Sequence, residues 1–134
     1  MNKYINKEDY LTYKGIDLET EIQDDDNHSN KVIRFVHEVT DWCLEYLVRH
    51  YDCNELLGRF DELKEFRQDY FRKGVMEQIE YILNNGLLMQ DSGLNRELTT
   101  IVDLSRIELS RNAYQKFFMG AFCNIVRYWL WVEI

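Results

Sequence analysis

The chain has 134 residues, of which 46% are hydrophobic and 30% are charged, and its net charge is −8. This length fits a single domain, 1–134, and the hydrophobic content is too high for intrinsic disorder to be the main state. The excess of acidic residues disfavours a protein that grips DNA, because such binding depends on Lys and Arg contacts to phosphates.

A short helix is predicted over residues 6–14, near the start of the chain. Asn6 can cap its first turn, and Gly15 stands where the helix would end. Residues 17–28 are rich in acids and are predicted to form a solvated loop. A calcium-binding loop over 24–29 is the alternative, although this stretch lacks the central Gly and the final Glu of an EF-hand.

The first long helix is predicted over residues 30–51. Its apolar residues recur with the i, i+3, i+4, i+7 spacing of one buried helix face. These residues are Val32, Phe35, Val36, Val39, Trp42, Cys43, Tyr46, Leu47 and Tyr51. Glu45 and Arg49 lie on the opposite face, four residues apart, in the order that favours an ion pair.

Two histidines fall on this helix. His50 projects onto the apolar face at the C-terminal end, and we interpret it as a core histidine that interacts with a carbonyl or with the helix dipole. A ligand or catalytic role for His50 is the alternative. His37 lies four residues before Asp41, but the spacing reveals no third metal ligand.

A second long helix is predicted over residues 61–84, after a short turn or helix over 54–59. Asp61 and Glu62 are placed in its first turn, where the helix dipole favours acids. Gly74 interrupts this helix and is predicted to permit close packing or a slight kink. The predicted buried stripe consists of Leu63, Phe66, Tyr70, Ile79, Ile82 and Leu83.

Residues 87–109 differ in character from the helices around them. Residues 90–93 carry a turn signal, and residues 97–109 are rich in Thr, Ile and Val with partial alternation. A short hairpin or an extended loop is therefore predicted here. Long loops in compact domains are often functional, so this segment is a candidate contact region.

The last helix is predicted over residues 111–131, entered through Ser110. Its apolar side chains cover more than half of the helical wheel, which is wider than the stripe of an ordinary surface helix. They are Tyr114, Phe117, Phe118, Phe122, Ile125, Val126, Tyr128, Trp129, Leu130 and Trp131. We expect another chain to cover part of this surface; the alternative is a core helix wrapped by the other helices of the same chain.

These elements together predict an all-α fold. The prediction is a small helical bundle with three main helices, a short N-terminal helix and a β-prone loop or hairpin before the last helix. No run of about 18 uncharged apolar residues occurs, so no membrane-spanning helix is expected.

The sequence gives no sign of an enzyme, a cofactor or a bound metal. Its three cysteines lack the CxxC spacing of a zinc site, and their odd number favours reduced thiols. Neither a glycine-rich phosphate loop nor an HExxH motif is present, and the three histidines fall in different parts of the predicted fold. We therefore expect no catalytic residue, no cofactor-binding residue and no metal ligand.

The order of the elements resembles one known protein family. A Tyr10-Leu11-Thr12 helix is followed by the segment 15–18, then by two long helices, the second ending in the stretch QIEYILNNG at 78–86. After the β-prone segment, the stretch LSRNAY at 109–114 opens the last helix. This arrangement is similar to that of the head–tail connector proteins of long-tailed bacteriophages, also called adaptor or head-completion proteins, over nearly the whole chain.

The resemblance implies a structural virion protein that forms a ring, usually of about twelve copies, under the portal protein. Such a ring extends the DNA channel, lets DNA pass without specific binding, and presents a surface to the next connector protein. It is assembled in the cytoplasm of the bacterial host and resides in the virion neck. Opposite charges on the two ends of the chain could supply head-to-tail contacts in such a ring, because residues 1–26 are the most acidic part of the sequence.

The resemblance also suggests two sets of contact residues. Contacts with neighbouring subunits or with the downstream protein are expected at Leu98, Ile101, Val102, Leu104 and Ile107. Contacts with the portal are expected at Tyr128, Trp129, Trp131, Val132 and Ile134. The alternative function is a small cytosolic helical module, such as a regulator, that docks one protein partner through its aromatic C-terminal helix.

Overall fold

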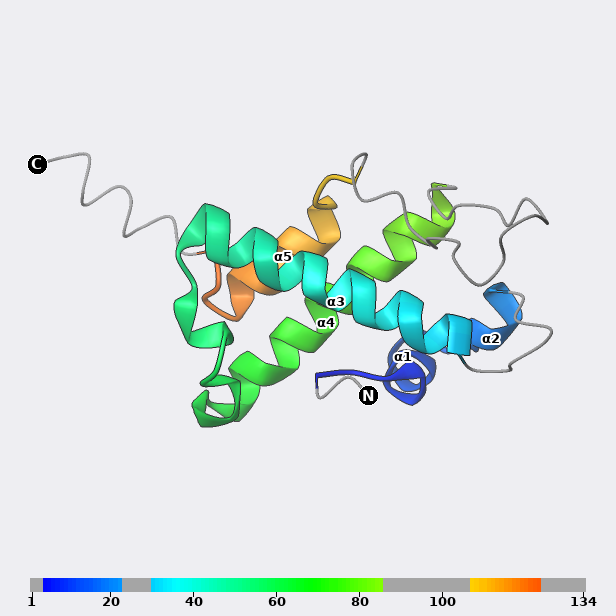
Figure 1. The fold of residues 1–134 in the computed structure, drawn as a ribbon, viewed down its shortest axis with the longest axis horizontal. Helices are drawn as coiled ribbons and strands as arrows, with labels where there is room; N and C mark the ends of the chain where they lie inside the picture. Colours follow the sequence, from blue (N-terminus) through cyan, green and yellow to red (C-terminus); the bar gives the residue numbers. More distant parts are fainter. Residues whose placement is uncertain (1–3, 23–29, 86–106, 124–134) are drawn as a thin grey trace, which may run out of the picture.

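A computed structural model of the chain describes residues 4–22, 30–85 and 107–123 (Figure 1). Within these three stretches every regular element is a helix, and no strand occurs. The elements are α1 (Lys7–Lys14), α2 (Leu18–Glu21), α3 (Asn30–Tyr51), the short 3-10 helices η1 (Asn54–Leu56) and η2 (Phe60–Glu62), α4 (Glu65–Asn84) and α5 (Arg111–Met119). The predicted all-α bundle is confirmed, whereas most of the predicted β-prone segment over 87–109 lies outside the described residues.

Helix α1 begins and ends at the predicted signals. The Asn6 side chain accepts a hydrogen bond from the Asp9 amide, and the Asp9 carboxylate accepts one from the Asn6 amide, both at 3.0 Å. Gly15 ends the helix with a φ of +73°, which is in the left-handed region that glycine adopts readily. The loop predicted over 17–28 is partly wrong, because Asp17 caps the one-turn helix α2; the calcium-loop alternative falls outside the described residues.

Charged groups that are buried or partly buried fix α1 against α4. The Lys14 ammonium lies 2.9 Å from the Glu77 carboxylate and 3.0 Å from that of Glu80, and the Tyr13 hydroxyl donates to Glu77 at 2.8 Å. Burial opposes the charge on Lys14, but its hydrogen bonds to the two carboxylates outweigh this effect and raise its pKa. The N-terminal helix is therefore held in one position on the bundle.

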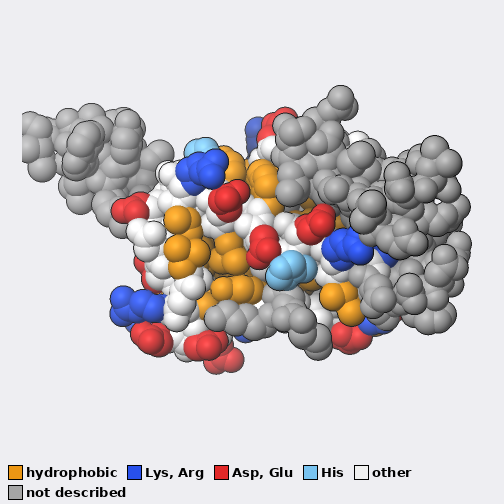
Figure 2. Space-filling view, in the orientation of Figure 1, with side chains coloured by type: hydrophobic (Ala, Val, Ile, Leu, Met, Phe, Trp, Pro, Cys, Tyr) orange, Lys and Arg blue, Asp and Glu red, His pale blue; other side chains and the backbone are white. Residues whose placement is uncertain are grey.

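Helix α3 has the predicted bounds and crosses over α4 and α5 in Figure 1. Its buried side is formed by Val32, Phe35, Val36, Val39, Thr40, Cys43 and Leu47. On its outer side, Arg49 and Glu45 form the predicted ion pair at 3.6 Å. Figure 2 views this side, where charged and histidine side chains are interspersed with hydrophobic ones.

Helix α4 begins later than predicted. Asp61 and Glu62 lie in η2, and the helix starts at Glu65. The turn between them is held by the Gln68 side chain, whose amide donates to the carbonyls of Phe60 and Leu63, both at 3.0 Å. These hydrogen bonds link a side chain of α4 to backbone carbonyls of the preceding turn. The spacing of apolar residues carries no information about such contacts, so it did not reveal the break between η2 and α4.

The buried side of α4 also differs from the predicted stripe. Phe66 is 51% exposed, and Tyr70 is only partly buried. The core positions are Phe71, Gly74, Val75, Met76, Ile79 and Ile82, together with the polar Glu77 and Gln78. Over its first two turns the helix therefore buries Phe71 in place of Phe66 and Tyr70, and the Phe71 ring packs against those of Phe60, Phe117 and Phe122.

The last helix is much shorter than the predicted 111–131, since α5 ends at Met119. The chain reverses through Ala121, which has a φ of +68°. The Phe122 amide donates to the Phe117 carbonyl at 2.8 Å, and the Ala121 amide donates to the Phe118 carbonyl at 2.9 Å. This pair of bonds is a Schellman motif, which ends a helix by satisfying its last carbonyls.

The expectation that another chain covers part of the apolar surface of the last helix can be compared with the structure only over residues 111–123, because residues 125–131 lie outside the described residues. Phe117 and Phe122 are fully enclosed by residues of their own chain. Phe118 and Met119 remain 48% and 51% exposed. Over residues 111–123 the structure therefore fits the alternative prediction, a helix wrapped by the other helices of the same chain. Phe118 and Met119 are the exceptions.

Close packing joins α5 to α4. A β-carbon added at Gly74 would lie 2.3 Å from the Phe117 ring, so glycine is required for the present approach of the two helices. This outcome agrees with the close packing predicted for Gly74. None of the described helices is both long enough and apolar enough to cross a membrane.

Candidate protein-contact surface

The two predicted contact sets fall mainly outside the described residues. The structure describes Ile107 and none of the other nine positions, which are Leu98, Ile101, Val102, Leu104, Tyr128, Trp129, Trp131, Val132 and Ile134. What the structure does describe is the part of the domain from which each contact segment departs. Residues up to 106 lead into Ile107, and residues from 124 onward follow Cys123.

Ile107 lies in a groove beside α3. The groove has a volume of about 220 Å³ and is lined by Trp42, Glu45, Tyr46, Arg49, His50 and Ile107. Ile107 is partly buried and packs against the core. The first predicted contact segment therefore joins the domain at a hollow whose other residues all come from the C-terminal half of α3.

Three stacked rings form one wall of this groove. The rings of Trp42 and Tyr46 have centroids 5.1 Å apart, and those of Tyr46 and His50 are 4.1 Å apart. The three residues are spaced by four along α3, which places them on one side of a helix. Partly exposed Trp and Tyr side chains are enriched at protein interfaces, so this wall has the composition of a protein-contact surface.

The position of His50 corrects its interpretation as a core histidine. His50 is exposed; it stacks on Tyr46, and its Nδ1 atom lies 3.1 Å from the Tyr46 carbonyl oxygen. The predicted carbonyl contact is confirmed, whereas the predicted burial of the ring is wrong. At the last turn of α3 the core no longer extends beside the helix, so the ring packs along the helix instead of into the interior.

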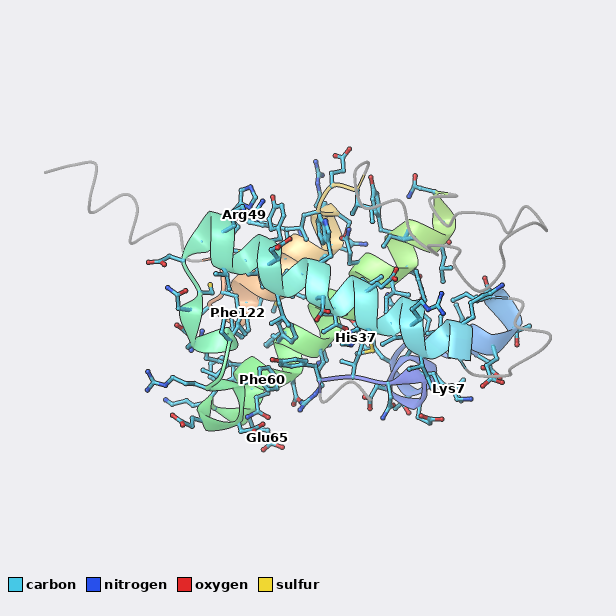
Figure 3. All side chains as sticks on the ribbon, viewed as in Figure 1. Lys7, His37, Arg49, Phe60, Glu65 and Phe122 are labelled. Atoms are coloured by element: carbon cyan, nitrogen blue, oxygen red, sulfur yellow. The ribbon has the colours of Figure 1, made fainter. Side chains whose placement is uncertain are left out.

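The other histidine on α3 forms a surface ion pair. His37 faces the viewer in Figure 3, and its Nε2 atom lies 3.1 Å from the Asp41 carboxylate. Across residues 4–22, 30–85 and 107–123, no three His, Cys, Asp or Glu side chains converge in a way that could hold a metal ion.

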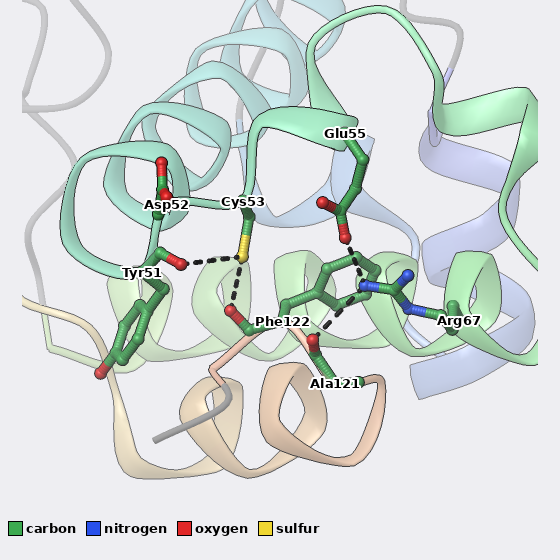
Figure 4. A pocket seen from close by; sticks show the side chains of 7 residues that line it. All are labelled: Tyr51, Asp52, Cys53, Glu55, Arg67, Ala121 and Phe122. Carbon is green, nitrogen blue, oxygen red and sulfur yellow. Dashed lines mark hydrogen bonds and ion pairs between the residues drawn. The ribbon is translucent and has the colours of Figure 1, made fainter. Parts of the chain in front are cut away.

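A second hollow lies where the C-terminal segment leaves the domain (Figure 4). Its volume is about 270 Å³, and it is lined by Tyr51, Asp52, Cys53, Glu55, Arg67, Ala121 and Phe122. The Arg67 guanidinium donates to the Gly120 carbonyl at 2.8 Å and to the Glu55 carboxylate at 2.9 Å. It also lies over the Phe122 ring, 4.6 Å from its centroid, so Arg67 holds the reversed turn after α5 against η1 and α4.

The cysteine at this hollow has a structural contact. The Cys53 thiol donates to the Phe122 carbonyl at 2.7 Å, which adds a second link between η1 and the turn after α5. All three cysteines are free and buried. Burial raises the pKa of Cys123 to about 12, which keeps this thiol protonated and unreactive near neutral pH.

Helix α4 clamps α5 at both ends. At the start of α5, the buried Gln78 side chain donates to the Glu108 carbonyl at 2.9 Å and accepts from the Ser110 amide at 3.0 Å. At its end, Arg67 binds the carbonyls of Gly120 and Ala121. Gln78 and Arg67 are about 16 Å apart along α4, close to the length of the nine-residue α5 with its caps.

Sequence reasoning identified neither clamp residue. Gln78 and Arg67 act through contacts with residues that are thirty or more positions away in the chain, and nothing local marks them. The ring wall had a usable signal, because Trp42, Tyr46 and His50 follow one another at intervals of four.

The Arg67 clamp gives a first testable prediction. We expect Arg67→Lys to lower the free energy of unfolding by about 1.5–3 kcal/mol, because bonds from a charged donor are lost and lysine cannot reproduce the fork of the guanidinium. Amide exchange at Phe122 should also accelerate, since its bond to Phe117 depends on the clamped turn. Urea unfolding and hydrogen-exchange measurements would check both effects.

Arg59→Lys is the matched control. The Arg59 side chain is 72% exposed and pairs with Glu62 at 3.4 Å on the surface, so its replacement should change stability by less than about 0.5 kcal/mol. Equal, small effects of the two substitutions would show that Arg67 does not hold the turn.

Comparison of the chain with protein-family models, with curated proteins and with solved structures finds no match.

Proposed function

We propose that the chain is a head–tail connector of a tailed bacteriophage, a structural virion protein that forms a ring under the portal. The ring extends the DNA channel and joins the head to the tail. The observation that carries this proposal is the clamped helix α5. It lies between the groove at Ile107 and the hollow at Phe122, so it fixes the two points from which the predicted contact segments depart.

A connector needs this arrangement because each copy has several neighbours at once. It has to contact adjacent subunits, the portal and the next protein of the neck with a fixed geometry, or the ring does not close. Two contact segments that depart beyond the two ends of one clamped helix keep a fixed spacing, because that helix, about 14 Å long, is held in place on the bundle. The packing of Phe117 on Gly74 keeps that spacing constant.

The charge of the protein supports the remaining parts of the proposal. With a net charge of −8, a ring of these chains would repel the phosphates of passing DNA and leave the DNA mobile. The partners in this proposal are further copies of the chain, the portal protein and the next head-closure or tail connector. The proposal places the protein in the virion neck after assembly in the bacterial cytoplasm and assigns it no enzymatic step, cofactor or metal.

Electron microscopy tests the proposal directly. The chain would be mixed with the portal ring encoded in the same genome, and we expect rings of the chain stacked on one end of the portal. A W129A/W131A double variant, altered at two predicted portal contacts, should retain its helical circular dichroism but no longer bind the portal.

Two results would contradict the proposal. One is a wild-type chain that stays unbound in the presence of the portal. The other is a pull-down from infected cells that returns a single host protein and no virion component, which would favour a regulator that docks one partner.

A further inference from the structure

The outer side of α5 carries positive charge that the rest of the domain does not neutralise. Arg111 and Lys116 are the charged residues of this helix, which has no acidic residue. Neither of them forms an ion pair with a carboxylate in the part of the chain that the structure describes. Phe118 and Met119 stand 48% and 51% exposed on the same helix.

The α1–α2 end has the opposite charge. Its two lysines are already engaged, because Lys7 pairs with Glu19 and Lys14 points inward to Glu77 and Glu80. Glu8 and Glu21 are exposed and have no ion pair within the described residues. Leu11 is 47% exposed on α1, so this end also combines an exposed apolar side chain with unneutralised charge.

These two surfaces lie toward opposite ends of α3. In Figure 1, α1 and α2 lie beside the N-terminal half of α3, and α5 lies behind its C-terminal half; Lys7 and Arg49 mark the two ends in Figure 3. Helix α3 has 22 residues and is therefore about 33 Å long. Because α1 is fixed to α4 by Lys14, one copy cannot bring the two surfaces together, whereas two copies can.

We propose that the α5 surface (Arg111, Lys116, Phe118 and Met119) binds the α1–α2 surface (Glu8, Leu11 and Glu21) of a neighbouring copy. This inference rests on the proposed function, and it names the subunit contact of the ring. The two surfaces differ, so the contact is heterologous: each copy uses its α5 surface on one neighbour and its α1–α2 surface on the other. Repeated around an axis, such a contact closes a ring.

Complementary charge reversal tests the contact. Variant A is E8K/E21K, and variant B is R111E/K116E. Each variant alone has like charges on both surfaces and should associate at least about tenfold more weakly than the wild type. An equimolar mixture of A and B should assemble again, because each reversed surface then meets a surface of opposite charge, and an even-numbered ring can alternate the two variants.

The control and the readout are chosen to separate this inference from the proposed function. Variant D61K/E65K makes the same change in net charge as variant A but on exposed residues away from both surfaces and from the Ile107 groove, and it should associate like the wild type. Sedimentation velocity at low and at high salt would measure association, which should weaken as salt screens the charges.

Three outcomes would overturn the inference. They are a wild-type chain that stays monomeric at low salt, variants A and B that associate like the wild type, or a mixture of A and B that does not recover. The portal-binding experiment is a separate test. If the chain stacks on the portal as a ring but variants A and B associate like the wild type, the connector function is supported and this subunit contact is wrong.

Discussion

Replacement of Phe71 by alanine is expected to lower the free energy of unfolding by about 3–5 kcal/mol, which is a large part of the stability of a domain of this size. Phe71 is fully buried. Its ring lies 5.4–5.9 Å from those of Phe60, Phe117, Tyr4 and Phe122. It therefore joins the N-terminal segment, η2, α5 and the reversed turn, and no single neighbour can move to fill the space it would leave.

The measurement is urea unfolding followed by circular dichroism. Phe66→Ala is the matched control, because Phe66 lies on the same helix five residues earlier and is 51% exposed. Its loss should cost less than about 1 kcal/mol. Similar effects of the two substitutions would contradict the central position of Phe71.

Replacement of Gly74 by alanine is expected to destabilise the protein, against the usual preference of helices for alanine. Helix propensity alone would favour alanine by about 1 kcal/mol. The new methyl group, however, would lie 2.3 Å from the Phe117 ring, which is buried and cannot swing into solvent. Forcing α4 and α5 apart costs about 1–3 kcal/mol, and we expect this term to outweigh propensity.

A double variant shows whether the contact is the cause. Combining Gly74→Ala with Phe117→Leu should cost less than the sum of the two single changes, because the smaller side chain makes room for the methyl group. Gly58→Ala is the control, since no heavy atom lies within 4 Å of a β-carbon at that position. A Gly74→Ala protein as stable as the wild type, with α5 unmoved, would contradict the packing described here.

The parts of the fold that depend on local signals could be predicted from the sequence. The Asn6 cap and the Gly15 stop fix α1 through contacts within the helix. Helix α3 carries one continuous apolar face, so its bounds follow from periodicity. These features need no knowledge of the remainder of the chain.

The parts that depend on distant contacts could not be predicted. The apolar pattern continues past Met119, but the chain turns there because Phe122 enters the core and Arg67 binds the carbonyls of the turn. Ala121 adopts a positive φ that its residue type does not indicate. The start of α4 likewise depends on the reach of Gln68 across the preceding turn.

The candidate contact surface was predictable only in outline. Ile107 was expected to contribute to a contact, and it lies in a groove, but the rings that face it belong to α3. Sequence spacing shows that Trp42, Tyr46 and His50 share one side of a helix, yet it does not show which distant residue stands opposite them. Ile107 stands opposite these rings because α5 and its two clamp residues, Gln78 and Arg67, fix the position of the chain that precedes α5.

The Arg67 clamp also determines how the domain would respond to mechanical tension. A force applied to the chain after Cys123 acts on the domain at Phe122. The Phe122 ring lies under the Arg67 guanidinium, and its carbonyl accepts a hydrogen bond from the Cys53 thiol. The force is therefore transmitted to α4 and η1 through these contacts, and the backbone hydrogen bonds of α5 do not break one turn at a time. Under tension the turn after α5 should therefore yield at the Arg67 clamp before α5 itself unravels.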